Sequence, residues 1–216
     1  MIAKTNSASV LGIDAHPVDV EVDVSIGLST FNIVGLPDGT IKESRDRVTA
    51  AVTNSGFNFP VRRIVVYLAP AALRKIGSGF DLPIAIALLG ALRYFPEQVL
   101  EKVMVVGELS LNGAIRPIRG ILPVAVAARD HGFEQLILPK ANEAEAAVIE
   151  EVRRVPVSTL DEVVRYLQGQ EEIQPTAYNP RRFFEEKRSS EKISRTSRDR
   201  SMSKAVSYTH LTLPTK

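Results

Sequence analysis

The chain has no cysteine, only three histidines and no apolar run of the length that a membrane-spanning helix needs. Without cysteine it cannot form disulfide bonds or thiolate metal sites, and this composition favours a cytoplasmic protein. His16, His131 and His210 do not have the spacing of metal ligands. The first residues also lack the apolar segment of a signal peptide. We therefore expect a cytoplasmic protein with no membrane partner and no bound metal.

A Gly-Lys pair is absent as well. Phosphate-binding loops of nucleotide hydrolases end in Gly-Lys-Ser or Gly-Lys-Thr, because the lysine reaches the phosphates. We therefore expect that this chain binds no ATP through such a loop and holds no cofactor by itself. The similar stretch Gly77-Ser78-Gly79 is more simply explained as a tight turn between a strand and a helix.

The net charge of +2 is unevenly distributed along the chain. Residues 1–180 carry 17 basic and 21 acidic side chains, whereas residues 181–205 carry 9 basic and 4 acidic ones. A basic segment is typical of proteins that bind nucleic acid or an anionic surface. Only the last part of the chain has this character, and the larger part is mildly acidic.

Hydrophobic periodicity predicts alternating strands and helices. Residues 18–24 have the pattern of a strand with one wet face, and residues 31–34 are its expected hairpin partner across a turn at Gly27. Asp38 is expected to cap the first helix. Further strands are expected at 64–68, 135–138 and 154–156, and helices at 38–54, 81–92, 117–131, 142–151 and 160–167. The predicted class is α/β (or α+β), with a mixed sheet packed against helices.

Residues 103–120 carry the most specific motif of the chain. They follow the order V-x-x-x-G-E-[IL]-[ST]-L-x-G-x-[IV]-x-P-I-x-G, which resembles the proteolytic domain of Lon-type serine-lysine proteases. The resemblance implies a Lon-like fold. Catalysis in that family needs a serine nucleophile and a lysine that takes its proton, so both side chains must be present.

The two catalytic positions of that family hold residues here that cannot perform this chemistry. Alignment of Lys75 and Gly77 with the family's Lys-x-Gly-x-Ser places Gly79 at the nucleophile position. Alignment of the Pro-Ile-x-Gly stretch places Leu122 at the base, and a leucine neither accepts nor donates a proton. The resemblance therefore implies a domain without catalytic residues.

Ser78 leaves one alternative open. It lies one residue from the nucleophile position, and a shift of register would bring it there. No lysine near Leu122 replaces the base, because the next lysine along the chain is Lys140. A residual serine peptidase that uses Ser78 is the second reading.

Four further motifs narrow the family. They are FNIVGLPD at 31–38, KESRDRV at 42–48, NSGF at 54–57 and VYLAP at 66–70. In this order they resemble the opening domain of the bacterial magnesium-chelatase-like AAA+ ATPases of the ComM/YifB type. Asp81 is interpreted as the cap of the central helix. The residues that we take as the fold signature are Gly35, Pro37, Gly77, Asp81, Gly107, Glu108, Gly113, Pro117 and Gly120.

This resemblance implies a function for a longer protein. Members of the family resemble hexameric machines that use ATP and Mg²⁺ and drive branch migration of DNA in recombination and natural transformation. We expect residues 1–170 to be the non-proteolytic Lon-like accessory domain of such an ATPase. Its expected partners are the missing AAA+ domain, other copies in a homo-hexamer and DNA. A magnesium chelatase subunit of pigment synthesis is the third reading.

The last part of the sequence raises the question of its origin. Residues 206–216 can be encoded by the end of a common sequencing adapter, so we interpret them as adapter read-through. Codons permitted for residues 191–200 encode, two bases later, a stretch similar to the start of the family's AAA+ domain. Residues 171–205 are accordingly predicted to be a linker and a basic tail that follows a frameshift. The alternative is a genuine disordered tail rich in Ser, Arg and Lys.

Overall fold

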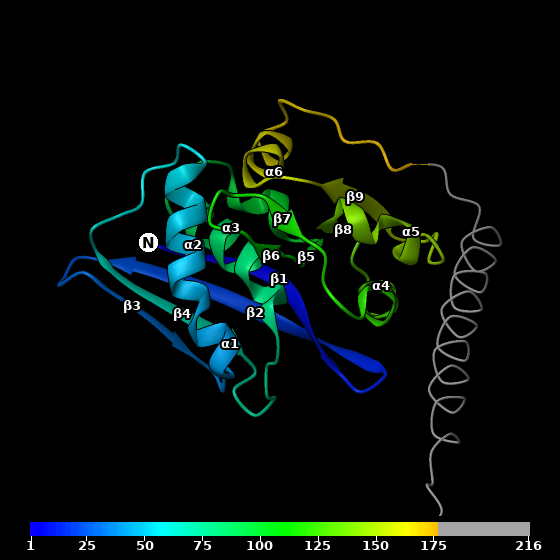
Figure 1. The fold of residues 1–216 in the computed structure, drawn as a ribbon, viewed down its shortest axis with the longest axis horizontal. Coiled ribbons are helices and arrows are strands. Elements are labelled where there is room, and N and C mark those ends of the chain that lie inside the picture. Colours follow the sequence, from blue (N-terminus) through cyan, green and yellow to red (C-terminus); the bar gives the residue numbers. More distant parts are fainter. Residues whose placement is uncertain (177–216) are drawn as a thin grey trace, which may run out of the picture. The chain divides into compact units, whose positions relative to one another are not determined.

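Seven strands form one mixed sheet in the order β3-β4-β2-β1-β5-β8-β9 (Figure 1). The computed structural model describes residues 1–176, and the predicted basic tail (181–205) and adapter read-through (206–216) lie outside them. The strands of this sheet are β1 (Ile2–Leu11), β2 (Asp14–Ser25), β3 (Thr30–Val34), β4 (Arg63–Ala69), β5 (Val103–Val105), β8 (Gln135–Pro139) and β9 (Arg153–Val157). A separate ribbon pairs β6 (Glu108–Leu109) with β7 (Ile115–Arg116).

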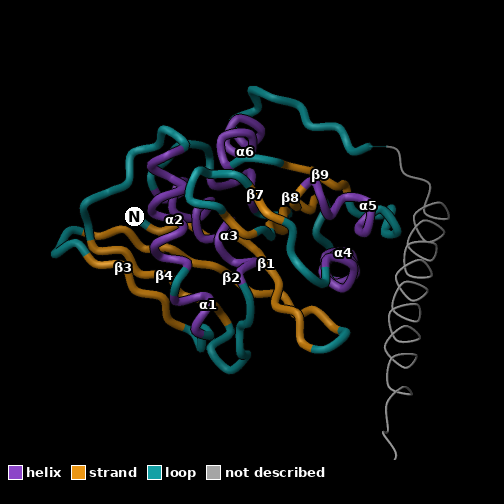
Figure 2. The backbone as a smooth tube through the Cα atoms, in the orientation of Figure 1, coloured by secondary structure: helices purple, strands orange, loops and turns teal. Residues whose placement is uncertain are grey.

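Helices pack on both faces of the sheet (Figure 2). The α-helices are α1 (Gly39–Lys42), α2 (Ser44–Asn54), α3 (Asp81–Ala91), α4 (Ile121–Asp130), α5 (Glu143–Ala146) and α6 (Leu160–Leu167). Short 3-10 turns are η1 (Ser78–Phe80), η2 (Glu97–Leu100) and η3 (Lys140–Asn142). None of the helices within residues 1–176 combines the length and the apolar character that crossing a bilayer requires.

The centre of the core is α3, as the sequence predicted. All eleven residues of this helix are buried, and it lies over β1 and β2. Val20 and Val22 of β2 and Val66 of β4 point to the same side of the sheet, because side chains alternate along a strand. A second apolar cluster under α4 and α5 covers the other face of β5 and β8. The expected α/β class with a mixed sheet packed against helices is confirmed.

The predicted hairpin between residues 18–24 and 31–34 is wrong. β2 pairs with β1 and β4, both antiparallel, whereas β3 pairs with β4 in parallel. Apolar side chains of β4 alternate with the same period as those of β2, so β4 continues the buried face. β3 is therefore displaced to the margin of the sheet.

Several helices are shorter than predicted. Asp38 does cap the first helix, since its carboxylate accepts the Ile41 N–H at 2.9 Å, but α1 and α2 are separated at Glu43. The helix expected at 117–131 begins only at Ile121, because Gly120 has a positive φ of 77° that a right-handed helix cannot contain. The helix expected at 142–151 is reduced to α5.

Candidate functional site

A cleft of about 610 Å³ lies beside the start of the central helix. The end of β1, the turn before α3 and the segment leading into α4 form its walls. Two ionisable side chains, Glu108 and Arg119, reach it, and most of its lining is apolar. The lining residues are Ala8, Val10, Gly12, Ile76, Gly77, Ser78, Gly79, Phe80, Val106, Glu108, Pro117, Ile118, Arg119, Gly120 and Val124.

Backbone hydrogen bonds fix the turn that carries Ser78. The Gly77 N–H donates to the Asp38 carboxylate at 3.1 Å. The Gly107 N–H donates to the Gly79 carbonyl at 3.0 Å, so the turn is also tied to the connection between β5 and β6. These contacts bring the Ser78 hydroxyl to the Glu108 carboxylate, to which it donates a hydrogen bond. The sequence did not predict this pair, because its members are 30 residues apart.

The two positions assigned by the protease resemblance do not meet in this cleft. Gly79 lines it, and a Cβ atom there would lie 3.7 Å from Ile118, an ordinary contact. Leu122 packs instead against the second apolar cluster and is not part of the lining. Position 79 therefore has room for a Cβ atom. Leu122, at the other catalytic position, packs against the second apolar cluster.

Asp81 anchors a buried polar network beneath the cleft. Its side chain has no exposed surface. One oxygen accepts from Arg47 Nε at 2.7 Å and from the Leu109 N–H at 3.2 Å, and the other accepts from Arg47 and from the Ser44 hydroxyl. The hydrogen bond to Asp81 raises the pKa of the Arg47 guanidinium. The network joins α2, α3 and β6, and so it holds the wall that carries Glu108.

The expectation that Asp81 caps the central helix is wrong. The capping residue of α3 is Phe80, and no side chain bonds the free N–H groups there. A buried carboxylate is stable only when it is hydrogen-bonded. The carboxylate of Asp81 accepts hydrogen bonds from Arg47, Ser44 and the Leu109 N–H instead of capping the helix. The contacts of Asp81 thus differ from those of the predicted cap.

Lys75 is a buried cation that the sequence did not single out. Its side chain has no exposed surface, and its ammonium donates to the carbonyls of Gly35, at 3.0 Å, and of Pro70. Removal from water lowers the pKa of the Lys75 ammonium. This lysine thus ties the segment that precedes α1 to the loop after β4.

Gly35 shows why the signature glycines are needed. Its φ is +101°, and a Cβ atom would lie 2.1 Å from the Leu68 carbonyl oxygen, so no other residue fits. Pro37 follows and forms a bridge with Lys75. Gly107 is close to Leu82 and Ile115. Of the remaining signature residues, Gly77, Pro117 and Gly120 line the cleft, whereas Gly113 lies in the turn between β6 and β7 near the end of α2.

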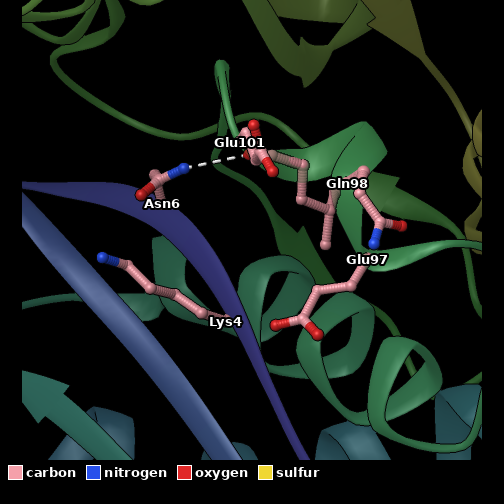
Figure 3. A pocket seen from close by; sticks show the side chains of 6 residues that line it. Lys4, Asn6, Glu97, Gln98 and Glu101 are labelled. Atoms are coloured by element: carbon pink, nitrogen blue, oxygen red, sulfur yellow. Dashed lines mark hydrogen bonds between the residues drawn. The ribbon is translucent and has the colours of Figure 1, made fainter.

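A second hollow of about 340 Å³ lies between β1 and η2 (Figure 3). Asn6 is held there by hydrogen bonds to the carbonyls of Leu100, at 3.0 Å, and Val103, at 3.2 Å. The Lys4 ammonium points away from Glu97 toward β2, where it pairs with Asp19 at 2.7 Å. Because Lys4 and Asn6 are already held by the fold and no lining residue has a hydroxyl or imidazole group, this hollow is a weaker candidate than the cleft.

Acidic side chains occupy the two places in the described residues where a metal ion or a phosphate could be sought. Asp19, Glu21 and Asp23 share one face of β2, but Asp19 pairs with Lys4 and Asp23 with the chain's amino terminus. Within residues 1–176, no group of three His, Asp or Glu side chains has the arrangement of a metal site. The Asp38 carboxylate at Gly77 would repel a phosphate at the turn that resembles a nucleotide loop.

Comparison with known proteins places the chain among relatives of two kinds. Residues 20–142 match the family described as subunit ChlI of Mg-chelatase. Protein YifB of Escherichia coli K12 is 40% identical over 169 residues, which are 78% of this chain and 33% of YifB. Competence protein ComM of Haemophilus influenzae is 40% identical over 172 residues, 80% of this chain and 34% of ComM. A Lon protease of Brevibacillus choshinensis is 29% identical over 161 residues, 69% of this chain and 20% of the protease. The chain thus spans about a third of the length of YifB and ComM.

Proposed function

Because the chain belongs to the family of subunit ChlI of Mg-chelatase, with YifB and ComM among its relatives, we propose that residues 1–176 are the non-proteolytic accessory domain of a bacterial AAA+ ATPase that acts on DNA. One observation carries the proposal. The chain is related in sequence to a Lon protease, but its cleft is lined by Gly79 at the nucleophile position and by no lysine. ATP, Mg²⁺ and a hexameric assembly belong to the longer protein in this proposal, and so does the cytoplasmic location.

A peptidase that uses Ser78 is the second candidate, and the Ser78–Glu108 hydrogen bond is the observation that favours it. In the Lon-type arrangement, however, a lysine takes the proton of the serine hydroxyl. Residues 1–176 also place no lysine or histidine on the cleft lining. The geometry therefore supports a non-catalytic domain better.

A peptidase assay separates the two candidates. The 216-residue chain is incubated with casein and with fluorogenic peptides, beside Ser78→Ala and Glu108→Gln. We expect no cleavage above the buffer blank for any of the three proteins. Cleavage that Ser78→Ala abolishes would establish the peptidase and remove the proposal.

The DNA role is proposed for the longer protein and not for this domain alone. Residues 1–180 carry more acidic than basic side chains, and phosphate contacts from Lys and Arg supply most of the affinity for DNA. We expect that the protein from the complete gene, which must encode a Gly-Lys-Ser or Gly-Lys-Thr loop, hydrolyses ATP and moves branched DNA junctions. A gene without that loop, or a protein with it that leaves four-way junctions intact, would contradict this role.

The third candidate, a magnesium chelatase subunit, is tested with the same complete protein. Magnesium insertion into a porphyrin, measured by absorbance, is expected to be absent. Insertion at a rate above the uncatalysed one would favour the chelatase over the DNA role.

A further inference from the structure

β3 forms one margin of the seven-stranded sheet, and within residues 1–176 its outer edge meets no other strand (Figures 1 and 2). In a parallel pair, alternate residues direct their N–H and C=O groups toward the partner strand. The Thr30 N–H donates to the Arg62 carbonyl, so Thr30 and Asn32 face β4 with their backbone groups. Phe31 and Ile33 therefore direct theirs outward.

The two margins of the sheet differ in how they are protected against pairing. Natural edge strands carry charges or proline that disfavour another strand. β9, at the opposite margin, has Arg153, Arg154 and Pro156. β3 reads Thr-Phe-Asn-Ile-Val and has no charge, no proline and no glycine. Such an edge is a template for a further strand.

We propose that β3 pairs antiparallel with β3 of a second copy of this chain, about a two-fold axis at Asn32. In this register Phe31 faces Ile33 of the second copy, and both direct their backbone groups outward. The two such pairs related by the axis would share four N–H to C=O hydrogen bonds. The two seven-stranded sheets would then be continuous.

A two-fold contact places the residues before Asn32 opposite those after Asn32 of the second copy. In β3 the residues that would face each other are compatible. Thr30 faces Val34 of the second copy, and both are β-branched and exposed. Phe31 against Ile33 is an aromatic and β-branched pair, which stabilises antiparallel strands. Leu28 and Leu36, just outside the two ends of β3, are 87% and 57% exposed.

The helices beside β3 add a rim that suits an identical partner. A hollow of about 500 Å³ runs between β3 and the α1–α2 segment. Its rim has both signs of charge, Lys42 and Arg45 with Glu43 and Asp46. A surface with both signs can complement a copy of itself, whereas a partner of a single sign would meet repulsion. This pairing does not depend on the proposed ATPase.

Cysteine cross-linking tests the register directly, because the chain has no cysteine of its own. At a residue on the axis the two Cα atoms of a non-hydrogen-bonded pair are about 4.5 Å apart, within the range of a disulfide. Asn32→Cys is therefore expected to form a disulfide-linked dimer under mild oxidation. Thr30→Cys is the matched control on the same face and should form little disulfide-linked dimer, because residue 30 of the second copy lies opposite Val34, four residues further along the strand. A mixture of Thr30→Cys and Val34→Cys should cross-link.

Charge at the axis gives a second test, read as the dimer Kd by sedimentation equilibrium of the 216-residue chain. Asn32→Lys and Asn32→Asp each place like charges opposite one another, and each is expected to raise the dimer Kd about fivefold. A mixture of the two variants should restore dimerisation through heterodimers. Asn32 is exposed, so neither change should alter the circular dichroism spectrum.

Three results would overturn the pairing. The first is a chain that stays monomeric at about 100 μM, far above the Kd of a specific complex. The second is equal disulfide cross-linking of Thr30→Cys and Asn32→Cys. The third is a dimer Kd that neither Asn32→Lys nor Asn32→Asp changes from that of the unchanged chain. The first would leave the edge to an extended segment of another protein, and the last would place the dimer contact elsewhere.

Discussion

Asp81 has no exposed surface, and both of its carboxylate oxygens accept hydrogen bonds from Arg47. Asp81→Asn removes the charge that compensates the guanidinium of Arg47, whose side chain is 21% exposed. Breaking a buried ion pair by changing one partner costs about 3–5 kcal/mol, and we expect the lower end of this range because Arg47 retains some water. Urea unfolding followed by circular dichroism measures the change. Asp46→Asn, at an 80% exposed side chain, is the control and should change the stability by less than about 0.5 kcal/mol.

The burial of Lys75 predicts that the free energy of unfolding depends on pH in the alkaline range. Burial lowers the pKa of its ammonium in the folded protein below that of the unfolded chain. Between these two pKa values the unfolded chain binds the proton and the folded one does not, so the free energy of unfolding rises with pH in that window. Lys75→Met should remove this rise, measured by urea unfolding from about pH 7 to about pH 10. If Lys75→Met retains it and the surface variant Lys42→Met loses it, the assignment to Lys75 is wrong.

The sequence motifs allowed residues to be assigned to family positions, but they did not predict which side chains contact one another in the folded protein. The assignment of Gly79 and Leu122 to the two catalytic positions is what the resemblance to the Lon family implies. The contacts of Ser78 with Glu108 and of Asp81 with Arg47 join residues 30 and 34 positions apart. Spacing along a chain does not contain such contacts, because the folded sheet and helices bring the residues together.

At the scale of elements, Gly35 sets the path between β3 and α1. Gly35→Ala would combine a positive φ of 101° with a Cβ atom 2.1 Å from the Leu68 carbonyl oxygen. We expect a loss of about 3 kcal/mol or more, because a left-handed residue costs about 1–2 kcal/mol and the clash adds to it. Gly12→Ala is the matched control, since its φ is +66° and no atom lies within 4 Å of its Cβ position. Equal losses in thermal or urea unfolding would show that the clash is relieved by a shift of the backbone.

The central helix tolerates no charge. Ile86 is fully buried in α3, and an unpaired carboxylate there has no partner to compensate the loss of water. Ile86→Asp is expected to give an unfolded or insoluble protein by circular dichroism and by recovery in the soluble fraction. Ile13→Asp, at an 89% exposed side chain, should fold normally. A folded Ile86→Asp protein would mean that α3 is not the centre of the core.

The elements with a strong pattern could be predicted, and their partners could not. Residues 81–91 are apolar on all sides, and this pattern allows only a central helix. The strands 18–24 and 31–34 were located correctly, but their alternation is compatible with either neighbour, and β4 takes the place beside β2. The start of α4 was predicted too early, because the sequence shows that residue 120 is a glycine but not that its φ is positive.

At the scale of the whole molecule, residues 171–176 pack as part of the compact unit that runs from Met1 to Thr176. Ile173 is 7% exposed, and both oxygens of the buried Glu143 carboxylate accept hydrogen bonds from Thr176. A chain that ends at residue 170 should therefore be about 3 kcal/mol less stable than one that ends at residue 176, from the lost apolar burial and the unpaired carboxylate. Equal urea midpoints for the two chains would show that residues 171–176 contribute nothing.

The unequal protection of the two sheet margins also limits how far an assembly can grow. If two copies join through β3, each remaining free margin is β9, with its arginines and its proline. Further strands are rejected there, so addition ends at the pair and does not continue into a filament. The chain would thus have a self-terminating mode of association, and replacing Arg153, Arg154 and Pro156 by threonine would be the change that opens it to fibre formation.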